Sequence, residues 1–340
     1  MKKNILFYSF FIVIIYLSSF SWEFIELPYT ESSIIGEYSQ HKYNSHNDLI
    51  RYLTFVFTPL IILLSYLFIT KQFSYINILE KIEFKKQLSH FSENNKNLYL
   101  LFIIFNFFLL LEFLSLEFPI QKADIFHEGQ QMSAAYKFRL DKSLWSGSYV
   151  TIGVIYEILA SNIAWNFFDN ISIGSTRFFD LLVIYLVKLF LIILCFQITI
   201  ITELKGSLRS IYFILISLIS VNLPDYYFQA AELDAREIFV ILTLIFIFQF
   251  FIGKDKSRYL ILLLGPISCL SVFYSIDRGL VVNLLIIFYL FILIIKKEKF
   301  FFGVLFSIIL SWLSSIYFLG NEFNYFIDNT LTTLNEINKI

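Results

Sequence analysis

The chain is poor in the residues on which soluble and disulfide-bonded proteins depend. Charged residues make up 16% of its 340 positions, and 58% are hydrophobic, whereas about 25% of a typical soluble domain is charged. The two cysteines, Cys195 and Cys269, lie inside apolar runs, which excludes a disulfide framework and a CxxC motif. A net charge of −1 gives no sign of nucleic-acid binding.

Several catalytic signatures are also missing. The sequence contains no glycine-rich phosphate loop, no HExxH and no GxSxG, so it lacks the motifs of P-loop ATPases, zinc peptidases and serine hydrolases. No internal repeat is visible either, whereas many transporters consist of two related halves.

Long apolar runs are the main feature that is present. A helix that crosses a bilayer needs around 20 mostly apolar residues. Runs of this kind cover residues 4–20, 52–70, 98–116, 180–202, 209–223, 237–252, 259–275, 280–295 and 300–319. They predict an all-α fold, a polytopic transmembrane helix bundle of about nine helices that forms one integral membrane domain over residues 1–340.

Lysine and arginine residues predict the orientation of this bundle. The first run follows Met1-Lys2-Lys3 and lacks a small-x-small cleavage site, so we expect an uncleaved signal anchor with a cytoplasmic N-terminus. Alternate connections then carry clusters of basic residues, such as Lys296, Lys297 and Lys299, which belong on the cytoplasmic side. Most acidic residues fall on the other side. The expected location is the bacterial inner (plasma) membrane.

Two polar segments are predicted to be extracytoplasmic. The first, residues 117–179, is the longest, and its apolar stretch 150–168 would reverse all later connections if it crossed the membrane. We therefore expect this stretch to lie at the membrane surface as an amphipathic helix, with Glu157 and Asn162 toward water. The second segment is a polar tail, residues 320–340.

The sequence ADIFHEGQQ in the first segment carries the strongest candidate site. Asp124, His127 and Glu128 have the spacing i, i+3, i+4 and would project from one face of a helix. Two carboxylates and an imidazole could hold a divalent cation such as Mg²⁺ or Mn²⁺, or position a base beside an acceptor hydroxyl. The alternative is that these polar residues simply face water.

Three further groups of charges have two interpretations each. Glu232, Asp234, Arg236 and Glu237 either belong to the functional site or form a charged cluster that the dipole at a helix N-terminus would stabilise. Asp277 and Arg278, in YSIDRG, either cap a turn or bind a phosphate, for which arginine is suited. Lys188 lies inside a span, where it either pairs with a carboxylate or phosphate in a cavity or extends to the outer surface.

The layout resembles the GT-C superfamily of membrane glycosyltransferases. The segments DIFHEGQQMSAAYKF and SLWSGSYVTIGVIYEI (within residues 124–158) look like a pattern in GT-C-like bacterial proteins of surface-polysaccharide clusters, and YSIDRG looks like a later outer-loop element. Those relatives often carry an acid where this chain has Gly147, and Asp141 could replace it. The likeness covers about 40 residues of the chain.

The resemblance implies transfer of a sugar from a polyprenyl-phosphate donor to a glycan or lipid acceptor at the outer face of the membrane. Asp124 would act as the base or hold a metal, assisted by His127 and Glu128. Asp277, Arg278 and Lys188 would bind the phosphate of the donor. A polysaccharide polymerase or ligase, a lipid-sugar transporter or flippase, and a non-enzymatic membrane scaffold are the alternatives.

Overall fold

The computed structural model describes residues 96–115, 127–202, 204, 206–221, 235–253 and 257–337, with a few helical residues between 13 and 65. The chain divides into two compact units. The first comprises Met1–Glu83 and Leu334–Ile340, and the second comprises Phe84–Thr333. The predicted spans 4–20 and 52–70 belong to the first unit and lie mostly outside the described residues.

The described residues of the first unit are helical, in line with the apolar composition of this part of the chain. They fall at positions 13–18 and 50–65, with gaps. Within the earlier group, the Ser18 hydroxyl donates a hydrogen bond to the Ile14 carbonyl oxygen at 2.8 Å.

The second unit is built from helices, and its described residues contain no β-strand. The longer helices are α7 (Lys96–Ser115), α8 (His127–Asp141), α9 (Ala160–Phe168), α10 (Ile173–Ile201), α11 (Gly206–Val221), α12 (Ile238–Ile252), α13 (Leu264–Tyr274), α14 (Ile276–Ile295), α15 (Phe300–Leu319) and α16 (Asn321–Ile337). Three short helical turns complete the set: η3 (Ile155–Leu159), η5 (Ala235–Glu237) and η6 (Ser257–Leu263).

Six segments of the second unit are long and apolar enough to cross a membrane. They are 97–115, 173–201, 235–252, 257–274, 276–295 and 300–319, and each matches a predicted apolar run. The run 209–223 forms α11, which at 16 residues is shorter than a full span. These helices indicate an integral membrane protein. Helix α15 has an exposed apolar surface of the kind that contacts lipid, since Phe302 and Phe318 are 74% and 82% exposed.

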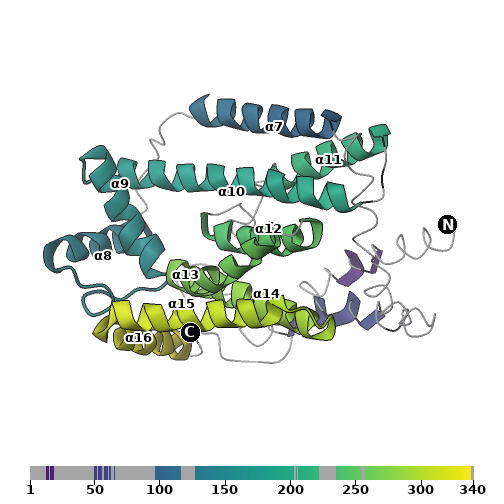
Figure 1. The fold of residues 1–340 in the computed structure, drawn as a ribbon. Coiled ribbons are helices and arrows are strands. Elements are labelled where there is room, and N and C mark those ends of the chain that lie inside the picture. Colours follow the sequence, from purple (N-terminus) through teal and green to yellow (C-terminus); the bar gives the residue numbers. More distant parts are fainter. Residues whose placement is uncertain are drawn as a thin grey trace. The chain divides into compact units, whose positions relative to one another are not determined.

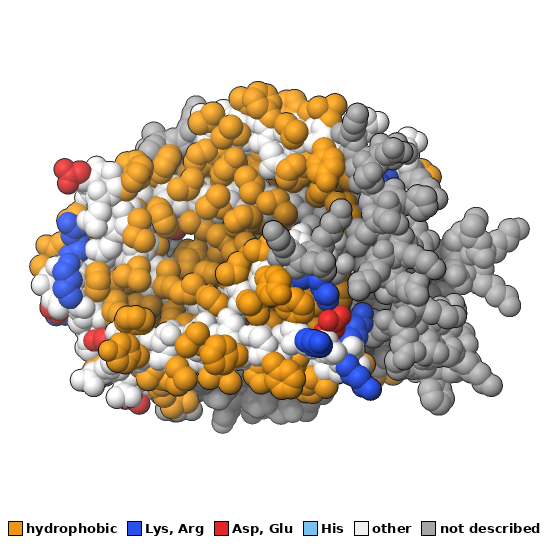
Figure 2. Space-filling view, in the orientation of Figure 1, with side chains coloured by type: hydrophobic (Ala, Val, Ile, Leu, Met, Phe, Trp, Pro, Cys, Tyr) orange, Lys and Arg blue, Asp and Glu red, His pale blue; other side chains and the backbone are white. Residues whose placement is uncertain are grey.

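The bundle is layered around α10. This helix packs against α7 and α11 on one side and α12 on another, while α12 contacts α14 and α13 packs between α14 and α15. In Figure 1 the chain runs back and forth between two ends of this unit, so that α8, α9 and the start of α16 lie at one end, and the α14–α15 connection lies at the other. Figure 2 shows Lys and Arg side chains gathered near both ends, with hydrophobic side chains between them.

Small residues allow the closest helix contacts. A Cβ atom added at Gly279 of α14 would lie 2.5 Å from the Val272 Cα of α13, and one added at Gly265 would lie 2.5 Å from the Ser307 backbone carbon of α15. Close backbone approach through small residues is a common way for membrane helices to associate. Pro266 lies in the first turn of α13, and the Leu262 carbonyl oxygen, four residues before it, accepts a hydrogen bond from the Ser307 hydroxyl at 2.7 Å.

Polar side chains form a row of hydrogen bonds between the same three helices, α13, α14 and α15, which we call the seam. Asn283 donates to the carbonyl oxygens of Ser268 and Gly279 at 2.9 and 2.8 Å, and the Trp312 indole N–H donates to the Ser268 hydroxyl at 3.0 Å. Such interhelical hydrogen bonds contribute roughly 0.6–2 kcal/mol each in membrane helices. The seam therefore fixes the α13–α14 turn, which carries Asp277 and Arg278.

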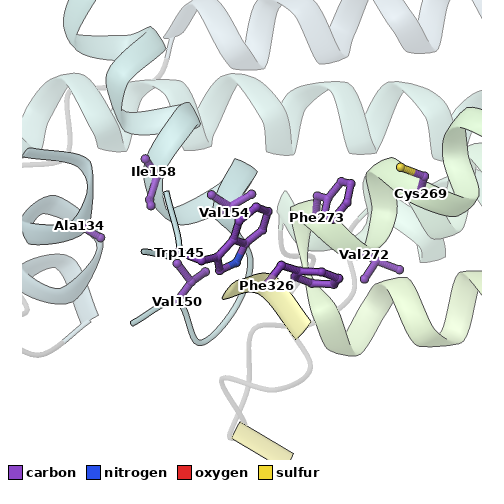
Figure 3. Close-up of a cluster of buried hydrophobic side chains, with 9 residues drawn as sticks. All are labelled: Ala134, Trp145, Val150, Val154, Ile158, Cys269, Val272, Phe273 and Phe326. Carbon is purple, nitrogen blue, oxygen red and sulfur yellow. The ribbon is translucent and has the colours of Figure 1, made fainter. Parts of the chain in front are cut away.

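The polar tail predicted at 320–340 contains the helix α16, which packs on the rest of the unit. Phe326 is 4% exposed and its ring lies 5.1 Å from those of Trp145 and Phe273. Figure 3 shows these three side chains together within the cluster that also includes Val150, Val154 and Ile158. The Asn329 amide exchanges two hydrogen bonds with the Val150 backbone, at 3.1 and 2.6 Å.

Candidate functional site at the α8 end

Several candidate residues gather at one end of the second unit, which we call the α8 end. We use this name for α8, the connecting segment 142–153, η3, α9, η5, the first turn of α14 and the start of α16. These parts come from four separate stretches of the sequence. Their contacts can therefore be followed residue by residue.

Helix α8 begins at His127, so the i, i+3, i+4 pattern is only partly tested. Asp124 and the side chain of His127 lie outside the described residues. Glu128 occupies the first turn of α8, where a negative charge is favoured by the helix dipole. Both of its carboxylate oxygens accept hydrogen bonds from Arg177 of α10, at 2.5 and 2.9 Å, and both side chains are about four-fifths buried.

The pairing with Arg177 bears on the predicted metal site. The described residues, which do not include Asp124, contain no group of three His, Cys, Asp or Glu side chains that could hold a metal ion. A bidentate arginine–carboxylate pair is among the stronger ion pairs. Glu128 therefore has a clear role in fixing α8 to α10, and the metal role stays a prediction.

The prediction that Glu157 and Asn162 face water is wrong. Glu157 is 2% exposed and Asn162 is 7% exposed, because α8 covers the face that carries them. The Asn162 amide donates to the carbonyl oxygens of Ala135 and Ile158, at 2.9 Å each. The apolar residues Ile163 and Phe167 take the exposed face instead, at 53% and 78%.

Glu157 occupies a π-helical turn and accepts several hydrogen bonds. Its Oε2 accepts from the backbone N–H groups of Thr151 and Ile152 at 3.0 and 3.2 Å. Its Oε1 accepts from the Thr151 hydroxyl at 2.9 Å and from the Gln130 amide at 3.1 Å. Burial raises the pKa of Glu157 above its ordinary value, and the hydrogen bonds from Thr151 and Ile152 oppose that rise. The carboxyl group thus joins α8, the connecting segment and η3.

The connecting segment lies directly against the α13–α14 turn. The Ile276 N–H donates to the Ile152 carbonyl oxygen at 2.7 Å, and a Cβ atom added at Gly153 would lie 2.2 Å from the Tyr274 carbonyl oxygen. The Tyr156 and Tyr274 rings meet edge to face at 5.8 Å. Two predicted site elements that are over 100 residues apart are therefore in contact.

Four charged side chains alternate in sign beside this turn. Arg278 Nε donates to Glu237 Oε1 at 2.6 Å, and Arg278 Nη1 lies 3.2 Å from Asp277 Oδ2. The same Asp277 oxygen lies 3.7 Å from Arg236 Nη1, and Ser275 donates its hydroxyl to the other oxygen at 2.5 Å. We call Arg236, Glu237, Asp277 and Arg278 the Arg278 network. It joins the start of α12 to the start of α14.

Lys188 has a partner on a neighbouring span. Its ammonium group lies 2.7 Å from Glu112 Oε1 of α7, with side-chain exposures of 23% for Lys188 and 51% for Glu112. Charges at membrane depth are costly unless they are paired. This pair therefore lowers the cost of placing Lys188 within α10. Glu128 pairs with Arg177, Lys188 with Glu112, and Arg278 with Glu237 and Asp277. These three predicted site residues therefore have different partners.

Asp141, the substitute carboxylate that the resemblance suggested, ends α8. It pairs with Lys137 at 2.5 Å and accepts hydrogen bonds from the Ser143 hydroxyl and backbone N–H. The hydrogen bonds from Lys137 and Ser143 lower the pKa of Asp141. It remains exposed, so its carboxylate is ionised at neutral pH and accessible to solvent.

Comparisons with family models, curated proteins and solved structures find no match for this chain. The likeness to the GT-C superfamily therefore stays a proposal, and the argument for the site is its geometry alone.

The sequence did not single out three residues that organise this end. Glu112 and Arg177 belong to none of the candidate groups predicted from the sequence, and Glu157 was expected to face water. The sequence does indicate that Glu157 is unusual. It is a lone acid inside the otherwise apolar stretch 150–168, and such a group needs either contact with water or a set of hydrogen-bond donors. The threonine at 151 and the glutamine at 130 supply such donors.

Proposed function

We propose that this protein is a membrane glycosyltransferase that moves a sugar from a polyprenyl-phosphate donor to a glycan or lipid acceptor at the outer face of the membrane. The observation that carries the proposal is the convergence of α8, the connecting segment and the Arg278 network at one end of an apolar bundle. A lipid-linked donor keeps its chain in the bilayer, and its phosphate and sugar lie at the surface. An ionisable site at the end of the spans suits such a substrate.

The Arg278 network supports the phosphate role. It contains two arginines that are about 30% exposed, at the starts of two helices, where the dipole favours an anion. The arginines pair with Glu237 and Asp277. In the proposed reaction the guanidinium groups stabilise the polyprenyl phosphate that leaves as the glycosidic bond breaks.

The base is assigned to the α8 side of the site. Asp124 accepts the proton of the acceptor hydroxyl as its oxygen attacks the anomeric carbon, and His127 orients that hydroxyl. Glu128 fixes the first turn of α8 through Arg177. A divalent cation at Asp124 and His127 is an alternative way to activate the acceptor.

A transfer assay on the full-length protein tests the proposal. The protein, purified in detergent, would be given a panel of polyprenyl-phosphate-linked hexoses and pentoses with cell-envelope glycan as acceptor, and release of polyprenyl phosphate would be measured. We expect release with at least one donor. Asp124→Asn and Arg278→Lys should reduce it at least 100-fold, since lysine cannot reproduce the forked contacts of arginine.

Arg258→Lys is the matched control, because Arg258, on η6, is a similarly buried arginine that pairs with Glu298. It should keep transfer within about twofold of the parent. The absence of release with every donor, or equal losses for Arg278→Lys and Arg258→Lys, would contradict the proposed function.

A second candidate has one observation in its favour. The Lys188–Glu112 pair lies between two spans, and transporters often place ionisable groups at such depth. Movement of a lipid-linked sugar across vesicle membranes without glycan transfer, and its loss in Lys188→Met, would favour a flippase.

A further inference from the structure

We infer that Glu157 is a positioning residue, which holds the connecting segment against the α13–α14 turn and thereby sets the geometry of the Arg278 network. The first step of the argument is the cost of its burial. A carboxylate that is 2% exposed is strongly destabilising unless donors surround it. Here four hydrogen-bond donors converge on its two oxygens, so the group is fixed on all sides.

The second step is what these donors are. Two are backbone N–H groups, of Thr151 and Ile152, and they belong to a segment without helical hydrogen bonds of its own. A third comes from Gln130, two residues after Glu128 on α8. Glu157 therefore ties an otherwise irregular stretch both to η3 and to α8.

The third step is the contact that this stretch makes. Ile152 uses its N–H to bind Glu157 and its carbonyl oxygen to accept the Ile276 N–H at 2.7 Å. Ile276 precedes Asp277 directly. A single residue, Ile152, thus connects the buried carboxylate to the first turn of α14, and Gly153 permits the close approach to Tyr274.

The π-helical form of η3 agrees with this role. Single π-turns inside helices are uncommon and often occur at functional sites. In η3 the turn directly precedes α9 and aims Glu157 at the connecting segment. The positional coupling is a property of the fold, whereas its consequence for sugar transfer rests on the proposed function.

A labelling experiment tests the coupling without any assay of transfer. Ile276 is 9% exposed, so Ile276→Cys should react slowly with a water-soluble maleimide in the full-length protein. Adding Glu157→Gln should raise the labelling rate at position 276 at least tenfold. Glutamine keeps the size of glutamate, but its NH₂ group would face donors in either orientation. The buried Cys195 of α10 reports on global unfolding in the same sample and should stay protected.

Two glycine variants give a matched comparison. Gly153→Ala disturbs the same contact from the other side and should also expose position 276, because the added methyl meets the Tyr274 carbonyl oxygen. Gly129→Ala, on α8, has nothing within 4 Å of its Cβ and should leave labelling unchanged.

The results separate the two proposals. An unchanged rate at position 276 in Glu157→Gln, or a rise matched by Cys195, overturns the positioning role. If the parent protein transfers no sugar, the labelling result still decides the coupling. If it does transfer, Glu157→Gln should lower kcat at least tenfold with little change in KM for the acceptor, whereas general destabilisation would only reduce the amount of active protein.

Discussion

The two ends of the second unit use charge in different ways. At the opposite end from α8, Lys296, Lys297 and Lys299 lie close together in the sequence around the single acid Glu298, and the Arg258 guanidinium stacks 4.1 Å from the Phe250 ring. We call this the lysine end. Its lysines lie on the short connection between α14 and α15.

The α8 end instead alternates charges of both signs and builds secondary structure around them. Glu128 pairs with Arg177, and Arg278 pairs with Glu237 and Asp277. The apolar cluster there is built mainly from α8, the connecting segment, η3, α13 and α16, and its members Trp145 and Phe326 are 6% and 4% exposed. The contrast teaches that excess positive charge is enough to orient a bundle, whereas a site needs paired charges on a packed framework.

The largest expected effect comes from removing a buried ring from the apolar cluster at the α8 end. Phe326→Ala removes a ring that contacts those of Trp145, Phe273 and Phe323, and we expect a loss of about 3–5 kcal/mol in the free energy of unfolding. Phe302→Ala, toward the lysine end, removes a ring that is 74% exposed and should change it by less than about 1 kcal/mol in detergent. Thermal unfolding of the two variants measures the difference, and equal losses would remove the contrast between the ends.

A glycine comparison should give the next largest effect. Gly279→Ala places a methyl group against the α13 backbone and should cost about 1–3 kcal/mol. Gly303→Ala meets only the end of the Leu262 side chain, at 3.0 Å, and gains helix propensity, so it should be nearly neutral. Melting temperatures in one detergent check both, and a neutral Gly279→Ala would show that α13 and α14 are not in close contact.

The Lys188–Glu112 pair, which lies between the two ends, should show a smaller effect. The effects of changing its two side chains should be coupled. Lys188→Met and Glu112→Gln should each lower stability by about 1–2 kcal/mol, because each leaves one charge unpaired among apolar side chains. The double variant should recover most of that loss. A double-variant cycle by thermal unfolding measures the coupling, and additive losses would mean that the two side chains do not interact.

The smallest effect is expected at Asp141. Asp141→Asn removes an exposed pair with Lys137 and should lower the melting temperature only slightly at neutral pH. Because the folded-state pKa is lowered, the contribution of this carboxylate is present above its ordinary pKa and is lost as the pH falls through the folded value. Transfer should also persist, and a loss of transfer at neutral pH would instead support Asp141 as a catalytic carboxylate.

The sequence predicts the spans far better than the site. The runs 98–116 and 300–319 agree within a few residues with α7 and α15, because hydrophobic length is a local property. The run 180–202 is too short at its start, since α10 continues back to Ile173 through polar residues such as Arg177 and Asp180. Arg177 is stabilised there by Glu128 of a distant helix, and no local pattern encodes such a contact.

Glu157 illustrates the same limit for the site. An acid and an amide in an apolar stretch normally mark the water-facing side of a surface helix, and the sequence cannot show that α8 returns to cover that side. In contrast, Asp277 and Arg278 were recognisable as a pair from their position next to Gly279. Only the fold brings Arg236 and Glu237 to them.

The most direct test of the account is the side of the membrane on which the two ends lie. Single cysteines at Lys142, Asp328 and Lys297, all exposed positions, would be treated with an impermeant maleimide in intact cells and again after permeabilisation. We expect positions 142 and 328 to react in intact cells and position 297 to react only after permeabilisation. Reaction of positions 142 and 297 from the same side would contradict an outer site built at the α8 end.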